Sequence, residues 1–415
     1  MKRKRWKPFN LGVLDHGLEA AYGLAEKAKI TADDTRRNRE TYALSRTKWY
    51  QGILDASSWS AEGITFRSKH VALTDCHSIV LEYGNFYQDD DPVRLADCVP
   101  FDLTVAVQVE GSARFYDVTW DGNTKETFNP GARIKSDPIG MELSKGQSMI
   151  VSVFFQGTKF PHGLVSQISN GEGARTGNLL KSTTFSPTSQ AILNPLAIYA
   201  KTADVGFETI ACIGDSISLG ASFGNEVFTG YPQGELGFMQ LAAMQSGRGY
   251  ISLGMNGQAL DGFEPYKRLR RMDLASRCDI ALINYGTNDL TGTKTISQLQ
   301  AYYLDVWKAA KMRGMRVYQT TITPRTTSTD SWVTVGKQSP LNARFGFGSS
   351  SDRAVLNKWI RSIPSEHLDG YIEVADIVET SRDSGVWKPG TTPDGIHPNR
   401  DMHLLIAEAV KKVIK

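Results

Sequence analysis

The spacing of hydrophobic and polar positions divides the chain into three parts. In residues 13–50, apolar residues recur at helical spacing with charges between them; they are Leu14, Leu18, Ala21, Leu24 and Ala25. Residues 51–203 contain short β-rich runs, and residues 204–415 alternate strand and helix patterns. We therefore predict an N-terminal helical segment at 1–50, followed by two domains at 51–203 and 204–415.

In the second part, apolar β-rich runs stand at residues 78–83, 103–109 and 149–155. Clusters of Gly, Pro, Asn and Asp separate these runs, and no helical pattern of similar length interrupts them. Such runs are typical of antiparallel sheets that pack face to face. The pattern predicts a β-sandwich of the jelly-roll kind.

In the third part, buried strand patterns alternate with amphipathic helix patterns. Strands are expected at 208–213, 279–284, 315–320 and 370–375, and helices at 296–311, 354–363 and 402–414. Alternation of this kind predicts an α/β fold with a parallel sheet and helices on both faces. Ligands of such sheets bind outside the carboxyl ends of the strands.

Composition and charge narrow the class of partner. Of the 415 residues, 40% are hydrophobic and 22% are charged, as in an ordinary globular protein. The net charge of +3 is too small to indicate a polyanionic partner. Because no run of about 18 apolar residues is present, no membrane-spanning helix is expected. We expect neither a nucleic-acid partner nor a membrane partner.

The start of the chain is strongly basic. Residues 1–7 resemble the charged region of a signal peptide, but Asp15, His16 and Glu19 interrupt the apolar stretch that should follow. We interpret them as a solvated basic tail, with nucleic-acid contact as the alternative. The compartment stays open between cytoplasmic and virion-associated. The helical segment could pack either on the following domain or on a second copy of the chain, so a homo-oligomer also stays open.

The cysteines form neither a CxxC pair nor a metal-ligand spacing; they are Cys76, Cys98, Cys212 and Cys278. Cys212 lies inside an apolar strand pattern and Cys278 lies just before one, which favours buried free thiols. A disulfide between Cys76 and Cys98 stays an alternative.

Three short motifs in the third part carry candidate chemistry. They are Gly214-Asp215-Ser216, Gly286-Thr287-Asn288-Asp289 and Asp394-Gly395-Ile396-His397. Ser216 follows a strand and a glycine, so its Oγ can project from the sheet edge while backbone N–H groups face a developing negative charge. Asp394 lies three residues before His397, so its carboxylate can bind Nδ1 of the imidazole and leave Nε2 to take the serine proton.

The amide of Asn288 can donate to an oxyanion. Each motif alone also has a structural explanation, as a helix-capping serine, an Asx-turn, or a turn with a helix cap. The chain has no G-x-S-x-G elbow around Ser216, which argues against the α/β-hydrolase version of this chemistry. The joint occurrence of the motifs at separate strand and helix ends favours acyl transfer through a serine.

In this order and setting, the motifs resemble the SGNH (GDSL) hydrolase superfamily over about residues 205–415. The resemblance implies a flavodoxin-like domain in which Ser216, Asp394 and His397 are catalytic. It implies an ester hydrolysis that uses no metal and no organic cofactor. It also implies an oxyanion hole that contains the N–H of Ser216 and the amide of Asn288.

A glycine in a further motif of the family supplies another oxyanion N–H, and the matching stretch is residues 252–257. Gly254 is the matching glycine in Ser252-Leu253-Gly254-Met255-Asn256-Gly257. Ser252 stands where the family often has Asn, so Gly257 stays a competing candidate.

The second part narrows the expected substrate. Ser136-Asp137-Pro138-Ile139, followed by residues 149–155, resembles the N-terminal sandwich that precedes SGNH domains in carbohydrate acetylesterases. This resemblance implies removal of O-acetyl groups from an acetylated carbohydrate. Candidate contacts to the sugar are His162 and four tryptophans, which are Trp120, Trp332, Trp359 and Trp387.

Two other functions stay open. One is a general short-chain ester hydrolase or lipase-like enzyme, which would lack a steep preference for acetate. The other is a glycan-binding, virion-type attachment protein with accessory esterase activity, whose glycan binding would survive loss of Ser216.

Overall fold

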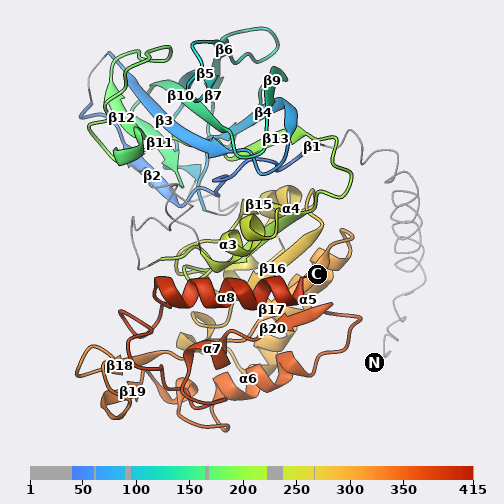
Figure 1. Cartoon of the computed structure of the whole chain (residues 1–415). Helices are drawn as coiled ribbons and strands as arrows, with labels where there is room; N and C mark the ends of the chain where they lie inside the picture. Colours follow the sequence, from blue (N-terminus) through green and yellow to red (C-terminus); the bar gives the residue numbers. More distant parts are fainter. Residues whose placement is uncertain are drawn as a thin grey trace, which may run out of the picture.

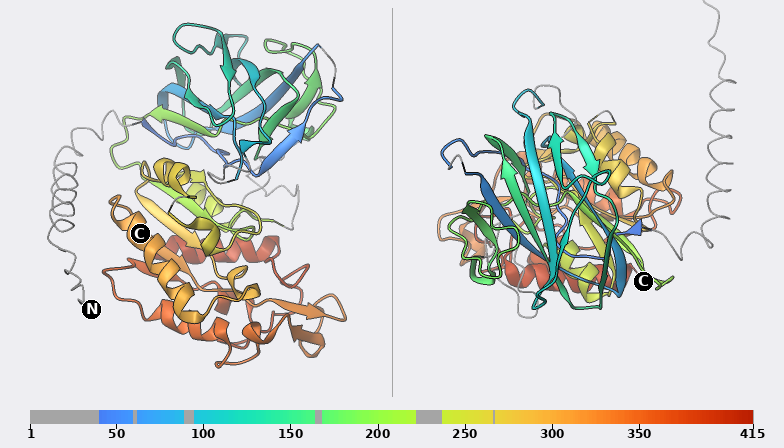
Figure 2. Two further views of the ribbon diagram at one scale, coloured as in Figure 1. Left: turned by 180° about the vertical axis from the view of Figure 1, so that it is seen from behind. Right: turned by 90° about the horizontal axis from the view of Figure 1, so that it is seen from above.

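The structure is a computed structural model that describes residues 40–59, 62–88, 95–163, 168–221, 237–265 and 267–414. Figure 1 shows two layered bodies, a β-structure from the first half of the chain and an α/β structure from the second half. Figure 2 shows from behind and from above that the β-structure is stacked on one side of the α/β structure. In the described part, no helix is long and apolar enough to cross a membrane.

Two antiparallel sheets form the first body. One has the order β1-β13-β4-β8 with β9 also paired to β4, and the other has the order β12-β3-β10-β5-β6 with β7 also paired to β5. A separate two-stranded antiparallel sheet pairs β2 with β11. The bounds are β1 Glu40–Thr41, β2 Gly52–Asp55, β3 Ile64–Val71, β4 Cys76–Gly84, β5 Phe101–Val109, β6 Phe115–Asp117, β7 Lys125–Phe128, β8 Arg133–Lys135, β9 Ile139–Leu143, β10 Ser148–Gln156, β11 Lys159–His162, β12 Gly173–Thr176 and β13 Ala197–Lys201.

The core of this body lies between its sheets. On β10, the alternate residues Met149, Val151, Val153 and Phe155 are buried and join one hydrophobic cluster with β4 of the other sheet. This two-residue period is what a half-buried strand presents to a core. The β-rich prediction for residues 51–203 is confirmed, whereas the jelly-roll connectivity stays a prediction.

A parallel sheet forms the second body. Its order is β15-β14-β16-β17-β20, and the neighbouring strands pair in parallel. Numbered along the domain, this order is 2-1-3-4-5, which is the flavodoxin-like order. The predicted parallel sheet is confirmed. The bounds are β14 Thr209–Gly214, β15 Gly249–Ser252, β16 Ile280–Asn284, β17 Arg316–Thr320 and β20 Gly370–Ile372.

Helices cover both faces of the parallel sheet. Along β14, Ile210 and Cys212 pack with α3, α7 and α8, whereas Ala211 and Ile213 pack with α4, α5 and α6. Because the strand is buried on both sides, its residues are continuously apolar. The bounds are α3 Phe238–Gln245, α4 Leu269–Ala275, α5 Ile296–Lys311, α6 Asp352–Arg361, α7 Ala375–Val378 and α8 Arg400–Val413.

Short elements fill the connections. A small antiparallel hairpin pairs β18, Thr326–Ser328, with β19, Gln338–Pro340. The 3-10 turns are η1 Ile168–Asn170, η2 Leu260–Phe263, η3 Asp289–Thr291, η4 Val335–Lys337 and η5 Ala343–Phe345. β13 ends at Lys201 and β14 begins at Thr209, on either side of the predicted domain boundary at 203/204, which stays a prediction.

The predicted helices at 296–311, 354–363 and 402–414 agree with α5, α6 and α8 to within two residues. The strand predicted at 370–375 is too long, since β20 ends at Ile372 and α7 begins at Ala375. The backbone N–H groups of Val374 and Ala375 both donate to the Thr321 hydroxyl at 2.9 Å, which turns the chain out of the ladder. α3, α4 and β15 had not been predicted.

The helical prediction for the N-terminal segment is wrong over residues 40–50. This stretch is extended, pairs with β13 through β1, and forms a bridge from Lys48 to Ser252 of the parallel sheet. Its polar residues Thr41, Ser45 and Thr47 are buried in these pairings. Because the pairing partners of residues 40–50 are so distant in sequence, no local pattern of residues predicts these strands. The rest of the predicted segment, residues 1–39, lies outside the described residues.

The four cysteines are buried and free, so the disulfide between Cys76 and Cys98 is not formed. Burial raises the pKa of the Cys76 thiol to about 12 and of the Cys98 thiol to about 11, with help from a neighbouring aspartate in each case. Free buried thiols were the prediction for Cys212 and Cys278, and the structure confirms it.

Candidate active site

Ser216 stands just past the carboxyl end of β14, in the turn at residues 215–221. The Asp215 carboxylate accepts the Ile217 N–H at 2.9 Å, and the Ser218 hydroxyl donates to the Asp215 carbonyl at 2.7 Å. A side chain at Gly214 would meet the Asn284 carbonyl at 2.5 Å, so only glycine lets the strand pass here. The turn leaves the Ser216 side chain half-buried.

Asp394 and His397 lie in the loop that precedes α8. One oxygen of Asp394 accepts the backbone N–H groups of Ile396 at 2.9 Å and His397 at 2.8 Å, and its other oxygen binds His397 Nδ1 at 2.7 Å. Gly395 has φ +75°, and a Cβ there would stand 2.1 Å from the Thr326 carbonyl. Glycine at this position allows the tight turn that aligns the carboxylate with the ring.

The electrostatics of this loop favour an ionised carboxylate. Partial burial alone would raise the pKa of Asp394. Hydrogen bonds from the His397 ring and from the N–H groups of His397 and Ile396 instead hold that pKa well below its usual value. Asp394 is therefore charged under ordinary conditions and fixes the proton of His397 on Nδ1.

The structure brings the two motifs together. His397 Nε2 stands 2.8 Å from Ser216 Oγ, although the residues are 181 positions apart in sequence. A hydroxyl, an imidazole and a carboxylate are thus hydrogen-bonded in series, each within the distance that a proton transfer requires.

Gly254 contacts the turn that carries Ser216. A Cβ at Gly254 would lie 2.6 Å from the Ser218 hydroxyl and 3.1 Å from Leu219. Within the described residues, the backbone N–H groups of Ser216 and Gly254 donate to no acceptor. Gly257 differs, because it is exposed, has φ +71° and would place a Cβ in open space. Of the two candidates, Gly254 is the one packed against the serine turn.

Asn288 follows β16 on the same edge of the sheet. Its Nδ2 donates to the Gln258 carbonyl at 3.1 Å and makes a longer contact of 3.4 Å to Asp215 Oδ2. Its Oδ1 accepts Nη1 of Arg325 at 3.2 Å. Both the oxygen and the nitrogen of this carboxamide are therefore hydrogen-bonded. Its contact to Asp215, beside the serine turn, is the longest and weakest of the three.

Sequence reasoning missed Arg325 and the chemistry of Asp215 and Asp289. Arg325 follows β17, and a charged residue just past the carboxyl end of a parallel strand was the signal that could have identified it. Burial raises the pKa of Asp215 to about 7 and that of Asp289 to about 6. Neighbouring carboxylates add to both shifts, Asp289 raising the pKa of Asp215 and Asp261 raising that of Asp289, whereas His397 and Arg325 lower the pKa of Asp215.

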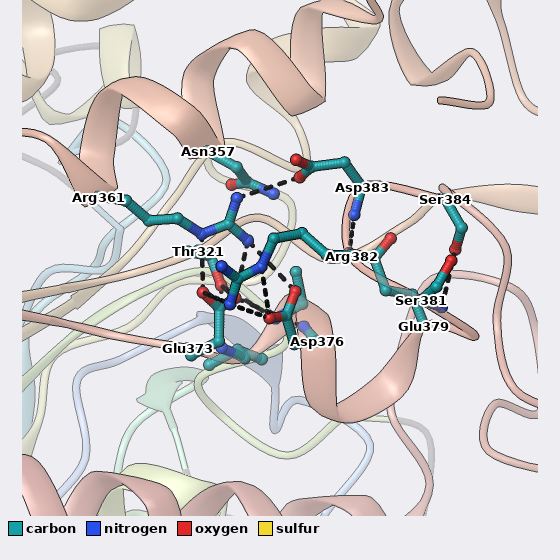
Figure 3. Close-up of polar contacts among 12 residues, drawn as sticks. Thr321, Asn357, Arg361, Glu373, Asp376, Glu379, Ser381, Arg382, Asp383 and Ser384 are labelled. Atoms are coloured by element: carbon teal, nitrogen blue, oxygen red, sulfur yellow. Dashed lines mark hydrogen bonds and ion pairs between the residues drawn. The ribbon is translucent and has the colours of Figure 1, made fainter. Parts of the chain in front are cut away.

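A charged network anchors the region that leads to Asp394. Arg361 on α6 binds Glu373 at 2.7 Å, Asp383 at 3.1 Å and Asp376 at 3.4 Å, as Figure 3 shows. Arg382 also binds Asp376 in this network. The network connects α6, β20, α7 and the following loop, and so restrains the chain before it reaches the catalytic candidates.

The proposed sugar contacts are scattered. Trp120 and Trp387 are buried, and Trp359 stacks on Trp307 with ring centroids 5.3 Å apart. His162 lies in β11 of the first body, with its ring against Gly52. Trp332 is different, because it is half-buried, donates to the Thr326 hydroxyl and lies against Gly395. It lies next to the Asp394 loop, as does the buried Trp387, whose indole donates to the Gly395 carbonyl at 3.1 Å.

Among the described residues, no group of three or more His, Cys, Asp and Glu side chains is arranged to hold a metal ion.

Residues 212–405 match the model of the GDSL-like Lipase/Acylhydrolase family. This part of the chain is therefore similar to GDSL-like hydrolases, in agreement with the resemblance of its motifs. The match spans β14 to α8 and contains Ser216, Asn288, Asp394 and His397.

Several solved structures are similar to this chain. A family two carbohydrate esterase from Clostridium thermocellum is 14% identical, with 88% of this chain and 98% of that chain covered and a TM-score of 0.36. A putative lipolytic protein of the G-D-S-L family from Desulfitobacterium hafniense is also 14% identical, with 50% and 99% covered and a TM-score of 0.37. A catalytic mutant of Axe2, an acetylxylan esterase from Geobacillus stearothermophilus, is 14% identical, with 50% and 94% covered and a TM-score of 0.35. The search of curated proteins found no match to this chain.

Proposed function

We propose that this protein is a serine esterase that removes O-acetyl groups from a carbohydrate through an acyl-enzyme intermediate. The observation that carries the proposal is the series of contacts from Ser216 Oγ to His397 Nε2 at 2.8 Å and from His397 Nδ1 to Asp394 at 2.7 Å. A half-buried serine in such a series has a base to take its proton and a carboxylate to orient that base.

In the first step, His397 Nε2 takes the proton of Ser216 as Oγ attacks the ester carbonyl carbon. Asp394 holds the ring in the tautomer with its proton on Nδ1 and stabilises the imidazolium that forms. The imidazolium then protonates the departing sugar oxygen as the ester C–O bond breaks, so that the sugar leaves with a free hydroxyl. In the second step, His397 deprotonates a water that attacks the acyl carbon. The bond from that carbon to Ser216 Oγ then breaks, the imidazolium returns its proton to Oγ, and the product leaves as acetic acid, which ionises to acetate.

The tetrahedral intermediate places a negative charge on the former carbonyl oxygen. The N–H groups of Ser216 and Gly254 donate to this oxygen in our proposal, as does the Asn288 amide. Both backbone groups lack another acceptor in the described part of the chain, and the Asn288 contact to Asp215 is long enough to be exchanged. Loss of one such donor typically lowers kcat by about 10²–10³.

The surroundings of the serine support a small acyl group on a polar leaving group. Asn288 and Arg325 supply amide and guanidinium groups beside the site, which suit hydroxyl-rich substrates. Trp332 offers an aromatic face next to the Asp394 loop, and aromatic faces stack on sugar rings. We therefore propose an acetylated polysaccharide as the substrate class.

The decisive variant is Ser216→Ala. Removing the nucleophile should abolish acetate release, while the melting temperature stays near that of the unmodified protein because the side chain is small and half-buried. Acetate release from a panel of acetylated polysaccharides, followed with both proteins, measures the effect. Turnover by Ser216→Ala would reject the proposal.

Aryl esters of increasing acyl length complete this test. A steep preference for acetate supports the carbohydrate substrate, whereas equal rates on longer chains would indicate a general ester hydrolase. Tight binding of insoluble glycans by Ser216→Ala, with negligible turnover by the unmodified protein, would indicate an attachment protein instead.

A further inference from the structure

A segment from the first body extends the catalytic sheet. β15 lies at the edge of the parallel sheet, and residues 47–49 run beside it. The N–H of Trp49 donates to the Ser252 carbonyl at 2.8 Å, and the N–H of Ser252 donates to the Thr47 carbonyl at 3.0 Å. The chain then reaches Gln51, next to the loop that contains Gly254.

The side chain of Gln51 bridges this loop. Its Nε2 donates to the Gly254 carbonyl at 2.9 Å, and its Oε1 accepts the Asn256 N–H at 3.0 Å. Nε2 also donates to the Trp49 carbonyl at 3.0 Å, so the hydrogens and the oxygen of the amide are all used. One carboxamide thus binds the loop on both sides of Met255, and a carboxylate or a shorter side chain could not replace both contacts.

Gln51 is itself held by the first body. Its backbone N–H donates to the His162 carbonyl at 2.7 Å. The adjacent Trp49 indole donates to the Gln88 carbonyl at 2.6 Å. The amide therefore projects from a fixed backbone, so it can restrain the loop rather than follow it.

The loop has few other restraints at its centre. Leu253 N–H donates to the Cys212 carbonyl at 2.8 Å, and Met255 N–H donates to the Gly214 carbonyl at 2.9 Å. Between them, Gly254 has no side chain to limit its rotation, and no larger residue fits against Ser218. Arg271 Nη1 also donates to the Leu253 carbonyl at 3.3 Å, and the contact from Gln51 to the Gly254 carbonyl is the side-chain hydrogen bond made directly to the residue whose N–H we assign to the oxyanion.

We infer that Gln51 is a positioning residue, which holds the Gly254 loop so that the Gly254 N–H meets the oxyanion. This inference rests on the proposed esterase function and adds a residue outside the GDSL-like domain to its apparatus. A donor that must be in place before charge develops contributes to the transition state and not to substrate binding. Loss of Gln51 should therefore act on kcat.

The test uses the full chain with Gln51→Ala, Gln51→Glu and the control Gln88→Ala. Gln88 is a neighbouring half-buried glutamine whose side chain contacts the Gln51 carbonyl at 3.5 Å and makes no contact with the loop. In Gln51→Glu, the acceptor for Asn256 remains but a carboxylate oxygen faces the Gly254 carbonyl. Activity on an aryl acetate is normalised to folded protein measured by circular dichroism.

For both Gln51 variants, kcat should fall by about 10- to 100-fold, less than for complete loss of a donor, with KM within about twofold. Affinity for an aryl boronic acid, which forms a tetrahedral adduct on Ser216, should fall in parallel. Gln88→Ala should keep the kcat and the boronic acid affinity of the unmodified protein.

Unchanged kcat in both folded Gln51 variants would overturn the inference. So would a loss confined to KM, with boronic acid affinity retained. If one variant does not fold, the other decides. If Ser216→Ala remains active, the proposed function itself is rejected. If Ser216→Ala is inactive but both Gln51 variants are fully active, only the positioning role of Gln51 is rejected.

Discussion

Two buried carboxylates distinguish the floor of this site. Asp215 and Asp289 are 1% and 4% exposed, and each accepts backbone N–H groups, from Ile217 and from Leu260 and Gly286 respectively. These donors favour the charged forms, yet burial outweighs them and raises both pKa values. Near neutral pH, the folded protein therefore holds protons that an unfolded chain would release.

This proton binding predicts the sign of a pH dependence. With a folded pKa of about 7 for Asp215, the folded state binds more protons than the unfolded state from about pH 4 to pH 7. The free energy of unfolding should fall as pH rises through this window, by up to about 1.4 kcal/mol per pH unit for one such group. Urea unfolding of Asp215→Asn should show a flatter profile than the unmodified protein.

The control for this profile is Asp204→Asn, on an exposed turn where the carboxylate accepts the Gly206 N–H. It should leave the slope unchanged. If the free energy of unfolding of Asp215→Asn fell with pH as steeply as that of the unmodified protein, the assignment of the buried proton to Asp215 would be contradicted.

At the scale of elements, an internal ion pair joins α6 to the loop before Trp387. Arg353 and Glu379 are both fully buried and lie 2.9 Å apart. Glu379 also accepts the N–H groups of Asp383 at 3.0 Å and Gly385 at 2.9 Å, and Arg353 donates to the Ile322 carbonyl at 3.2 Å. This pair organises the chain that continues to Asp394.

Arg353→Met should destabilise the protein strongly. It leaves the Glu379 carboxylate buried without its cation, which typically costs about 3–5 kcal/mol. The double variant Arg353→Met/Glu379→Leu should recover part of the loss, because no charge then remains buried. Urea unfolding measures both, with Arg382→Ala as the control: its exposed ion pair with Asp376 should contribute less than about 1 kcal/mol. Equal stability of Arg353→Met and Arg382→Ala would contradict this role.

The elements also show how far the sequence predicts this structure. Continuous apolar runs and helical periodicity located β14, β16, β17, α5, α6 and α8, because these signals are local. β15 was not predicted, because Gly249–Ser252 is short. Its pairing partners, β14 and residues 47–49, also lie far away in sequence. Residues 40–50 were misassigned for the same reason, since Ser45 and Thr47 make their side-chain hydrogen bonds to distant strands, at Val71 and Tyr250.

The candidate site divides in the same way. Ser216, Asn288, Asp394 and His397 stand in short motifs, so the sequence could name them before their geometry was known. Gln51 carries no local signal, because a single glutamine in a β-rich segment says nothing of a loop 203 residues further on. Contacts made only by the tertiary fold are the part that sequence reasoning could not reach.

At the scale of the whole molecule, two hydrophobic clusters each contain residues of both bodies. Trp49, Tyr50 and Phe86 of the first body pack in the same cluster as Leu253 and Met255, which border the catalytic turn. The Tyr42 hydroxyl also donates to the Leu274 carbonyl at 2.8 Å across this contact. A shared apolar core couples the unfolding of the two bodies, unlike a polar interface between independent domains.

This coupling predicts that a fragment of residues 204–415 will not reproduce the catalytic domain. Without residues 40–203, the edge of β15 loses its pairing with residues 47–49, and apolar side chains such as Leu253 and Met255 meet water. Each fully exposed side chain of this size costs about 1.5–3 kcal/mol, and an unpaired apolar edge strand promotes aggregation. The fragment should be poorly soluble and low in kcat, whereas residues 40–415 should unfold in one calorimetric transition and keep the activity of the full chain. A monomeric 204–415 fragment with unchanged kcat would show instead that the GDSL-like domain is complete without the segment that contains Gln51.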